Sequence, residues 1–142
     1  MINSSRIVRA NNLRVRAPRV PIDLQVESRT IGTSAAYQLY TEDISRSGLL
    51  LVWNREVKMP FNVNTLLELT IDPKGSCLDR PVSCLGKVVR RDIDNGIEKI
   101  TRLGIQIVQI DNTDLNAWEG CLTQLEKRFG IGVASNNKVL GA

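Results

Sequence analysis

Residues 43–53 read DISRSGLLLVW, a polar turn followed directly by an unbroken apolar run. Aspartate and serine favour turns because they bond their own backbone, and glycine adopts backbone conformations that other residues avoid. The run Leu49–Trp53 is typical of a strand that is buried on both faces or that enters a barrel. This stretch therefore predicts a strand that begins at a tight turn in a β-rich domain.

Further segments with strand character flank this stretch on both sides. They alternate apolar and polar residues or are bounded by turn residues, and they are Val20–Ser28, Ala35–Ile44, Leu66–Ile71, Val82–Arg91 and Ile97–Ile110. The last two are separated by Asp94-Asn95-Gly96, whose Asn-Gly pair favours a hairpin. We expect a mainly β fold with five or six antiparallel strands.

After Ile110 the apolar period changes from 2 to about 3.5 residues, which indicates an amphipathic helix. The apolar stripe consists of Leu115, Trp118, Leu122, Leu125 and Phe129. Asn112 or Thr113 can cap the start of this helix, and Gly130 is suited to end it. We expect the helix, at about residues 113–129, to cover the sheet or the open end of a barrel.

The chain has 142 residues, which fits one domain with a core that needs no disulfide or metal. We expect a flexible basic arm at residues 1–12, a domain at 13–130 whose β part ends at about 111, and a frayed tail at 131–142.

Composition argues against metal sites and against most catalytic mechanisms. The sequence contains no histidine, and its three cysteines (Cys77, Cys84 and Cys121) have no C-x-x-C spacing. A zinc site and the Ser-His and Cys-His nucleophile pairs therefore lack their usual residues. We expect a protein that is not an enzyme, holds no metal or other cofactor, and keeps its cysteines as reduced thiols.

No apolar run approaches the roughly 18 residues of a membrane span, and the N-terminus lacks a secretory signal pattern. We expect a cytoplasmic protein without membrane insertion.

The positive charge is concentrated near the N-terminus. Residues 1–22 carry five arginines and no acid, whereas the remainder carries 14 basic and 15 acidic residues. A local positive field favours an anionic partner bound at one place. Nucleic-acid binders usually spread basic residues along a face with aromatics between them, and none of the aromatic residues lies in this basic segment. We therefore expect no nucleic-acid partner.

The turn itself carries groups suited to ligand binding. Asp43 can accept hydrogen bonds from a guanine edge, Ser45 can donate to phosphate, and Gly48 lacks a side chain that would block close approach. Arginine supplies the complement, because its planar fork matches both guanine and phosphate. The candidate arginines are Arg14, Arg16 and Arg19. Together these residue types predict a pocket for a small, anionic, guanine-containing ligand.

Three segments carry a resemblance to a known family. Residues 14–24 (RVRAPRVPIDL), 43–50 (DISRSGLL) and 103–105 (LGI) resemble a PilZ domain, a likeness that runs from about residue 13 to 111. The resemblance implies a six-stranded antiparallel β-barrel with a helix over it. It also implies a bacterial receptor for the second messenger cyclic di-GMP.

The family binds its ligand with an R-x-x-x-R loop and a D/N-x-S-x-x-G turn. The turn matches at every position, but the arginine loop is degenerate. If Arg19 fills the second arginine position, the first falls on Val15, with an arginine on either side. The ligand-binding residues implied by the resemblance are Arg14, Arg16, Arg19, Asp43, Ser45 and Gly48.

Two functions follow from these motifs. The first is a cyclic di-GMP receptor that signals to a downstream protein through ligand-induced ordering of its N-terminal arginine loop. The alternative is a PilZ-like protein–protein interaction domain that binds no nucleotide, which Val15 favours. The motifs also have purely structural explanations: Asp43 and Ser45 can bond their own turn, and the arginines can form a solvated arm. Arg90 points outward by alternation, either toward the same pocket or as a plain surface residue.

Overall fold

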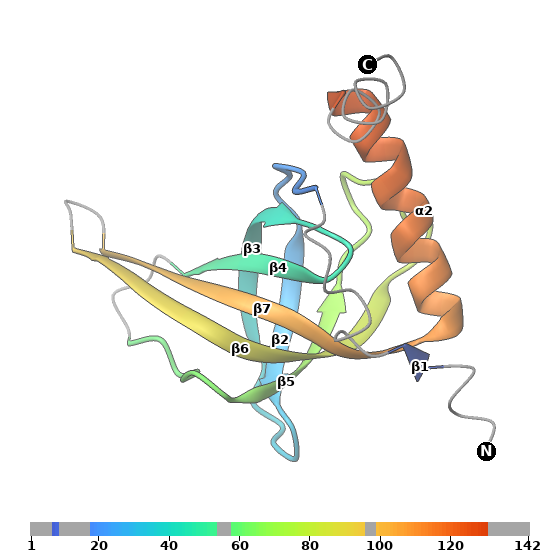
Figure 1. Cartoon of the computed structure of the whole chain (residues 1–142). Coiled ribbons are helices and arrows are strands. Elements are labelled where there is room, and N and C mark those ends of the chain that lie inside the picture. The colour runs from blue at the N-terminus through green and yellow to red at the C-terminus, as the bar shows by residue number, and fades with distance from the viewer. Residues whose placement is uncertain (1–6, 9–17, 54–57, 96–98, 131–142) are drawn as a thin grey trace.

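The computed structural model describes residues 7–8, 18–53, 58–95 and 99–130, which form seven strands and one helix (Figure 1). The elements are β1 (Ile7–Val8), β2 (Gln25–Thr30), β3 (Tyr37–Ile44), β4 (Gly48–Trp53), β5 (Leu66–Ile71), β6 (Val82–Asn95), β7 (Lys99–Asp111) and α2 (Asn112–Phe129). No helix in these residues is long and apolar enough to cross a membrane.

Six strands close into an antiparallel barrel. The order is β7-β4-β3-β2-β5-β6, and β6 pairs back onto β7, which closes the sheet. β1, which falls within the segment expected to be an arm, pairs with β7 at Ile110 and Asp111. The β6–β7 hairpin extends beyond the other strands, and α2 stands beside one end of the barrel (Figure 1). The predicted fold, a mainly β six-stranded barrel with a C-terminal helix, is confirmed.

The first barrel strand starts later than the alternation of Val20–Ser28 predicted. β2 begins at Gln25, and Val20 forms only an isolated bridge to Ile44. Between them the Thr41 hydroxyl donates to the Ile22 carbonyl (2.6 Å) and accepts from the Leu24 amide (2.8 Å). The Thr41 side chain thus supplements the one backbone bond here, from the Thr41 amide to the Leu24 carbonyl (2.9 Å), and residues 21–24 follow the barrel wall without forming a strand.

The apolar run of β4 is buried on one face only, which fits a strand in a barrel and excludes burial on both faces. Leu49, Leu51 and Trp53 point into the core, while Leu50 and Val52 are half-buried on the outside. At the Trp53 end, the ring of Tyr37 makes edge contacts with Trp53 (5.9 Å between centroids) and Phe61 (5.5 Å). These aromatic rings close one end of the barrel core.

The helix α2 packs at the other end of β4. Its start differs from the prediction: Asp111, one residue before Asn112, is the cap and accepts from the Thr113 amide. Gly130 ends the helix with φ 70°, as predicted. The apolar stripe is buried except for Phe129, which is 47% exposed. Glu126, three residues earlier, is instead buried against the turn that follows β3.

Gly48 lies where β4 approaches β7 most closely. A Cβ placed on Gly48 would stand 2.2 Å from the carbonyl oxygen of Ile105, which is backbone and cannot rotate away. Gly48 is itself buried and pairs with Gln106. The glycine of the turn motif is therefore required by the barrel wall, whatever it does for a ligand.

We expect Gly48→Ala to lower the free energy of unfolding by about 1–3 kcal/mol, because the new methyl group must push β4 away from β7. Urea unfolding measures this change. Gly120→Ala is the matched control: Gly120 lies exposed in α2 with no atom within 4 Å of its added Cβ. That substitution should stabilise the protein by about 0.5–1 kcal/mol through helix propensity. Equal stability of the Gly48→Ala variant and the parent would contradict this account of the glycine.

Candidate functional site

A one-residue bulge in β3 aims Asp43 at the outside of the barrel. Thr41 pairs with Leu51 and Asp43 pairs with Leu50, so Glu42 is the extra residue. Residues two apart in a regular strand share a face, which would put Asp43 inside with the buried Thr41. Because the bulge shifts the phase, Asp43 instead lies on the outer face beside Leu50.

Residues 19–24 run alongside β3 and bring the predicted arginine loop to the turn. Val20 and Ile44 exchange two backbone hydrogen bonds of 2.8 and 2.9 Å, and both side chains are buried. The Thr41 bonds described above fix the same segment further along. Arg19 is thereby fixed next to the outward-facing Asp43.

Arg19 and Asp43 form an ion pair, with 2.5 Å between the arginine Nη1 and the aspartate Oδ1. The Arg19 side chain is 55% exposed and that of Asp43 is 21% exposed. An ion pair this open to solvent contributes only about 0–1 kcal/mol to stability. A ligand can therefore separate or share the pair at little cost, while the pair keeps both groups at one place.

The inside of the turn is occupied by Ser45 and Gly48. The Ser45 amide donates to the Gly48 carbonyl (2.9 Å), and the Ser45 hydroxyl lies 3.4 Å from the same oxygen. Ser45 is 3% exposed. This geometry agrees with the structural explanation of the motif, and donation from Ser45 to a phosphate stays a prediction.

The turn is also bound to α2. The buried indole of Trp118 donates to the Ser45 carbonyl (3.2 Å). The Arg46 guanidinium contacts both carboxylate oxygens of Glu126 (2.5 and 3.2 Å) and the hydroxyl of Thr123 (3.1 Å). A bidentate contact to a buried carboxylate fixes the orientation of the guanidinium as well as its distance from the carboxylate. The turn and the helix thus form one unit although they are about 80 residues apart in sequence.

The outer face beside the turn carries few large side chains and is partly apolar. Asp43, Leu50, Gly104 and Arg90 lie in register across β3, β4, β7 and β6. A Cβ on Gly104 would lie 3.3–3.9 Å from atoms of the Arg90 side chain, so that chain folds over the glycine. Arg90 is exposed and pairs with Asp92 at 2.9 Å. It is a surface arginine at the far end of the row that contains Asp43.

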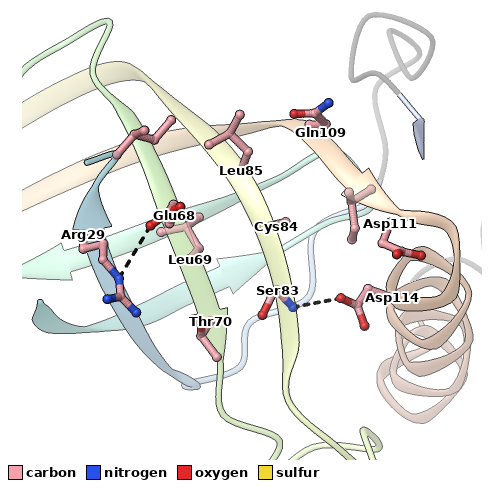
Figure 2. A pocket seen from close by; sticks show the side chains of 12 residues that line it. Arg29, Glu68, Leu69, Thr70, Ser83, Cys84, Leu85, Gln109, Asp111 and Asp114 are labelled. Atoms are coloured by element: carbon pink, nitrogen blue, oxygen red, sulfur yellow. Dashed lines mark hydrogen bonds and ion pairs between the residues drawn. The ribbon is translucent and has the colours of Figure 1, made fainter. Parts of the chain in front are cut away.

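A large pocket lies elsewhere, on the outer faces of β2, β5, β6 and β7, and no turn-motif residue lines it (Figure 2). It encloses about 770 Å³. In this pocket Arg29 contacts Glu68 (3.7 Å), and Asp114 accepts from the Ser83 amide (3.3 Å). Burial, and secondarily Asp114, raises the pKa of the Cys84 thiol in this pocket to about 12. Its carboxylates Glu68 and Asp114 are paired with Arg29 and Arg80, and no residue of the binding motif lies in its lining.

Among the described residues, no group of three or more cysteine, aspartate and glutamate side chains is placed to hold a metal ion. The candidate site therefore consists of Arg19 and Asp43 on the outer face, with Ser45 and Gly48 beneath them. Arg14, Val15 and Arg16 lie outside the described residues, so their part in the site stays a prediction.

Comparison with known proteins agrees with this geometry. The family model of the PilZ domain matches residues 13–124. The chain belongs to the PilZ domain family. No curated protein matches its sequence.

Two solved structures share the fold of this PilZ domain. One is described as the Bacillus subtilis inhibitor of motility (MotI/DgrA), with a TM-score of 0.63 and 19% identity over 81% of this chain. The other is MrkH, described as a c-di-GMP-dependent transcription regulatory factor, with a TM-score of 0.64 and 18% identity over 79% of this chain. The chain spans about half the length of each, 51% in both cases.

Sequence reasoning missed three residues that hold the PilZ turn in place: Arg46, Trp118 and Glu126. Arg46 occupies a variable position of the motif, and Trp118 was assigned to the apolar stripe without a partner for its N–H. Glu126 follows Leu125 on the buried side of α2. A charged residue beside an apolar stripe is a usable signal, because burial of a carboxylate requires a cation nearby.

We expect Arg46→Ala to lower the free energy of unfolding by about 1–3 kcal/mol, because it leaves the buried Glu126 carboxylate without its cation. Urea unfolding of both proteins measures the loss. The double variant R46M/E126L should recover much of it, since it removes both charges together.

The ion pair between Arg80 and Asp114 (2.7 Å) provides the control, because it also contacts α2 but not the turn. Arg80 is more exposed than Arg46, at 43% against 27%, so Arg80→Ala should cost less than Arg46→Ala. A larger cost for Arg80→Ala would show that the contact at the turn contributes little to stability.

Proposed function

We propose that this PilZ domain is a non-enzymatic receptor for cyclic di-GMP. The observation that carries the proposal is the contact between Arg19 and Asp43, which joins the two predicted halves of the binding motif at one place on the barrel surface. The family membership and the description of MrkH as c-di-GMP-dependent support the same ligand.

In this proposal each residue has a distinct task. Arg19, with Arg14 or Arg16, grips guanine and phosphate with its planar fork. Asp43 accepts from the edge of a guanine, Ser45 donates to phosphate, and Gly48 permits close approach. The ion pair between Arg19 and Asp43 opens or is shared when the ligand enters, at small cost because it is exposed.

The signal, we infer, has two parts. The bound ligand orders the N-terminal arginine loop that precedes Arg19 against the barrel, which changes the surface offered to a downstream protein. The same ligand acts on the turn, whose Ser45 carbonyl and Arg46 side chain are bound to α2. A change at the turn therefore reaches the helix through direct contacts.

Calorimetric titration of the pure protein with cyclic di-GMP tests the proposal, with GTP and cyclic di-AMP as controls. Saturable binding of cyclic di-GMP alone supports it. Absence of heat and of any other binding signal at high micromolar ligand would contradict it and favour the interaction domain. That alternative has one structural observation on its side, since the Ser45 hydroxyl is buried within its own turn.

We expect Arg19→Ala and Asp43→Ala each to weaken cyclic di-GMP binding by about 1–3 kcal/mol, because each removes a charge-assisted or bidentate contact. Titration calorimetry measures the affinity. Arg29→Ala and Glu68→Ala are matched controls, since they break another exposed arginine–carboxylate contact, in the larger pocket (Figure 2). Their affinities should equal that of the parent. A folded Arg19→Ala variant with the parent affinity would remove Arg19 from the site.

We expect Val15→Arg to tighten binding by about 1–3 kcal/mol, or about 5-fold to 150-fold in Kd, because it restores the family's four-residue arginine spacing. Val15→Lys adds the same charge without the planar fork and should recover only part of the gain. Unchanged affinity of Val15→Arg would mean that Arg14 or Arg16 already fills that place, or that the loop does not reach the ligand. Loss of binding in the R14A/R16A double variant would identify the first case.

A further inference from the structure

A second pocket is lined by residues close in sequence to Arg19 and Asp43, and the binding motif does not account for it. It encloses about 540 Å³ on the outside of the barrel, between residues 21–23 and the outer faces of β3 and β4. Pro21 is two residues beyond Arg19, and Glu42 is next to Asp43, so both walls of the pocket continue from the two halves of the motif. A space of this size is in the range of small-molecule sites.

The bulge in β3 places this pocket and Asp43 on the same face. Tyr40 pairs with Val52 and Asp43 pairs with Leu50, in successive outward-facing rows across β3 and β4. Outward-facing residues in successive rows lie about 7 Å apart along a strand. A ligand that contacts Asp43 therefore reaches the Tyr40 ring without leaving this face.

Three side chains give the pocket its chemistry. Tyr40 is 48% exposed and offers an aromatic surface beside the half-buried Val52. Asp23 is exposed, and it has no hydrogen-bond or ion-pair partner among the residues that the structure describes. Glu42 is bound by the Arg102 guanidinium at 2.9 Å, so its charge is largely compensated. An aromatic ring next to an unpaired carboxylate suits a flat group that carries hydrogen-bond donors on its edge.

We propose that this pocket is a subsite for one guanine base, in which the base stacks on Tyr40 and Asp23 accepts from its N1–H and 2-amino groups. This inference rests on the proposed function, because the phosphate of the same nucleotide would lie at Arg19. Stacking on aromatic side chains and hydrogen bonding on the Watson–Crick edge are the usual means of holding a splayed base.

The charges of the pocket agree with this orientation. A carboxylate only accepts hydrogen bonds, so Asp23 repels phosphate and can accept two bonds from the N1–H and 2-amino groups of guanine, but only one, from the 6-amino group, beside the N1 acceptor of adenine. Arg19, two residues before the pocket residue Pro21, attracts the phosphate. A guanine nucleotide therefore has one favourable direction across this face, and selectivity against adenine follows from Asp23.

The experiment compares the affinities of cyclic di-GMP, cyclic di-IMP, which lacks the 2-amino group, and cyclic di-AMP. We expect Tyr40→Ala to weaken cyclic di-GMP binding about 5-fold to 150-fold, and Tyr40→Phe to stay within about 2-fold, because only the ring is needed. Asp23→Asn should weaken cyclic di-GMP about 10-fold to 150-fold. It should also shrink the parent's preference for cyclic di-GMP over cyclic di-IMP and cyclic di-AMP.

The controls are Leu66→Ala, an exposed apolar residue outside the pocket, and Asp79→Asn, an exposed carboxylate outside it; both should bind like the parent. Thermal midpoints confirm that the variants are folded. One possible result is that the parent binds cyclic di-GMP and Arg19→Ala weakens this binding, whereas the folded Tyr40→Ala and Asp23→Asn variants bind like the parent. That result overturns the subsite and leaves the receptor function standing. A parent that binds none of the three ligands overturns both.

Discussion

The extra residue at Glu42 is the constraint on which both the barrel and its candidate site depend. Without it, Asp43 would share the inner face with Thr41 and would bury a carboxylate in an apolar core. With it, Thr41 and Ile44 both point inward and Asp43 points outward. Thr41 then binds the backbone of residues 22–24, and Ile44 bridges to Val20, so the segment that carries Arg19 lies beside Asp43. The one-residue bulge thus turns Thr41 and Ile44 into the core and places Asp43 beside Arg19 on the outer face.

The turn that follows is held on three sides, which links the surface site to the helix. On the barrel side, Gly48 lets β4 approach the Ile105 carbonyl so closely that no side chain fits between them. On the N-terminal side, Val20 bridges to Ile44. On the helix side, Trp118 binds the Ser45 carbonyl and Arg46 binds Glu126. In the proposed receptor, a ligand that contacts Asp43 would therefore act on α2 through the adjoining turn, by the direct contacts of Ser45 and Arg46.

The fold could be predicted largely from sequence, because strand alternation, turn residues and the helical stripe are local patterns, and the D-x-S-x-x-G turn carries the family resemblance. Errors arose where a distant partner overrides the local pattern. The strand expected from Val20 does not form before Gln25, where the Thr41 hydroxyl binds the Ile22 carbonyl. Phe129 is exposed although it continues the apolar stripe of the helix. The bulge, the pairing of Arg46 with Glu126, and the pocket at Tyr40 depend on register between strands, which a single sequence does not reveal.

The most direct test uses the two tryptophan indoles as probes in a ¹H–¹⁵N correlation spectrum during titration with cyclic di-GMP. Trp118 donates to the Ser45 carbonyl, whereas Trp53 lies at the opposite end of β4. A Trp53→Phe variant assigns the two signals. If the nucleotide binds at the turn and acts on α2, the Trp118 indole resonance moves in a saturable way and further than that of Trp53. An unchanged Trp118 resonance at saturating ligand would contradict the central claim.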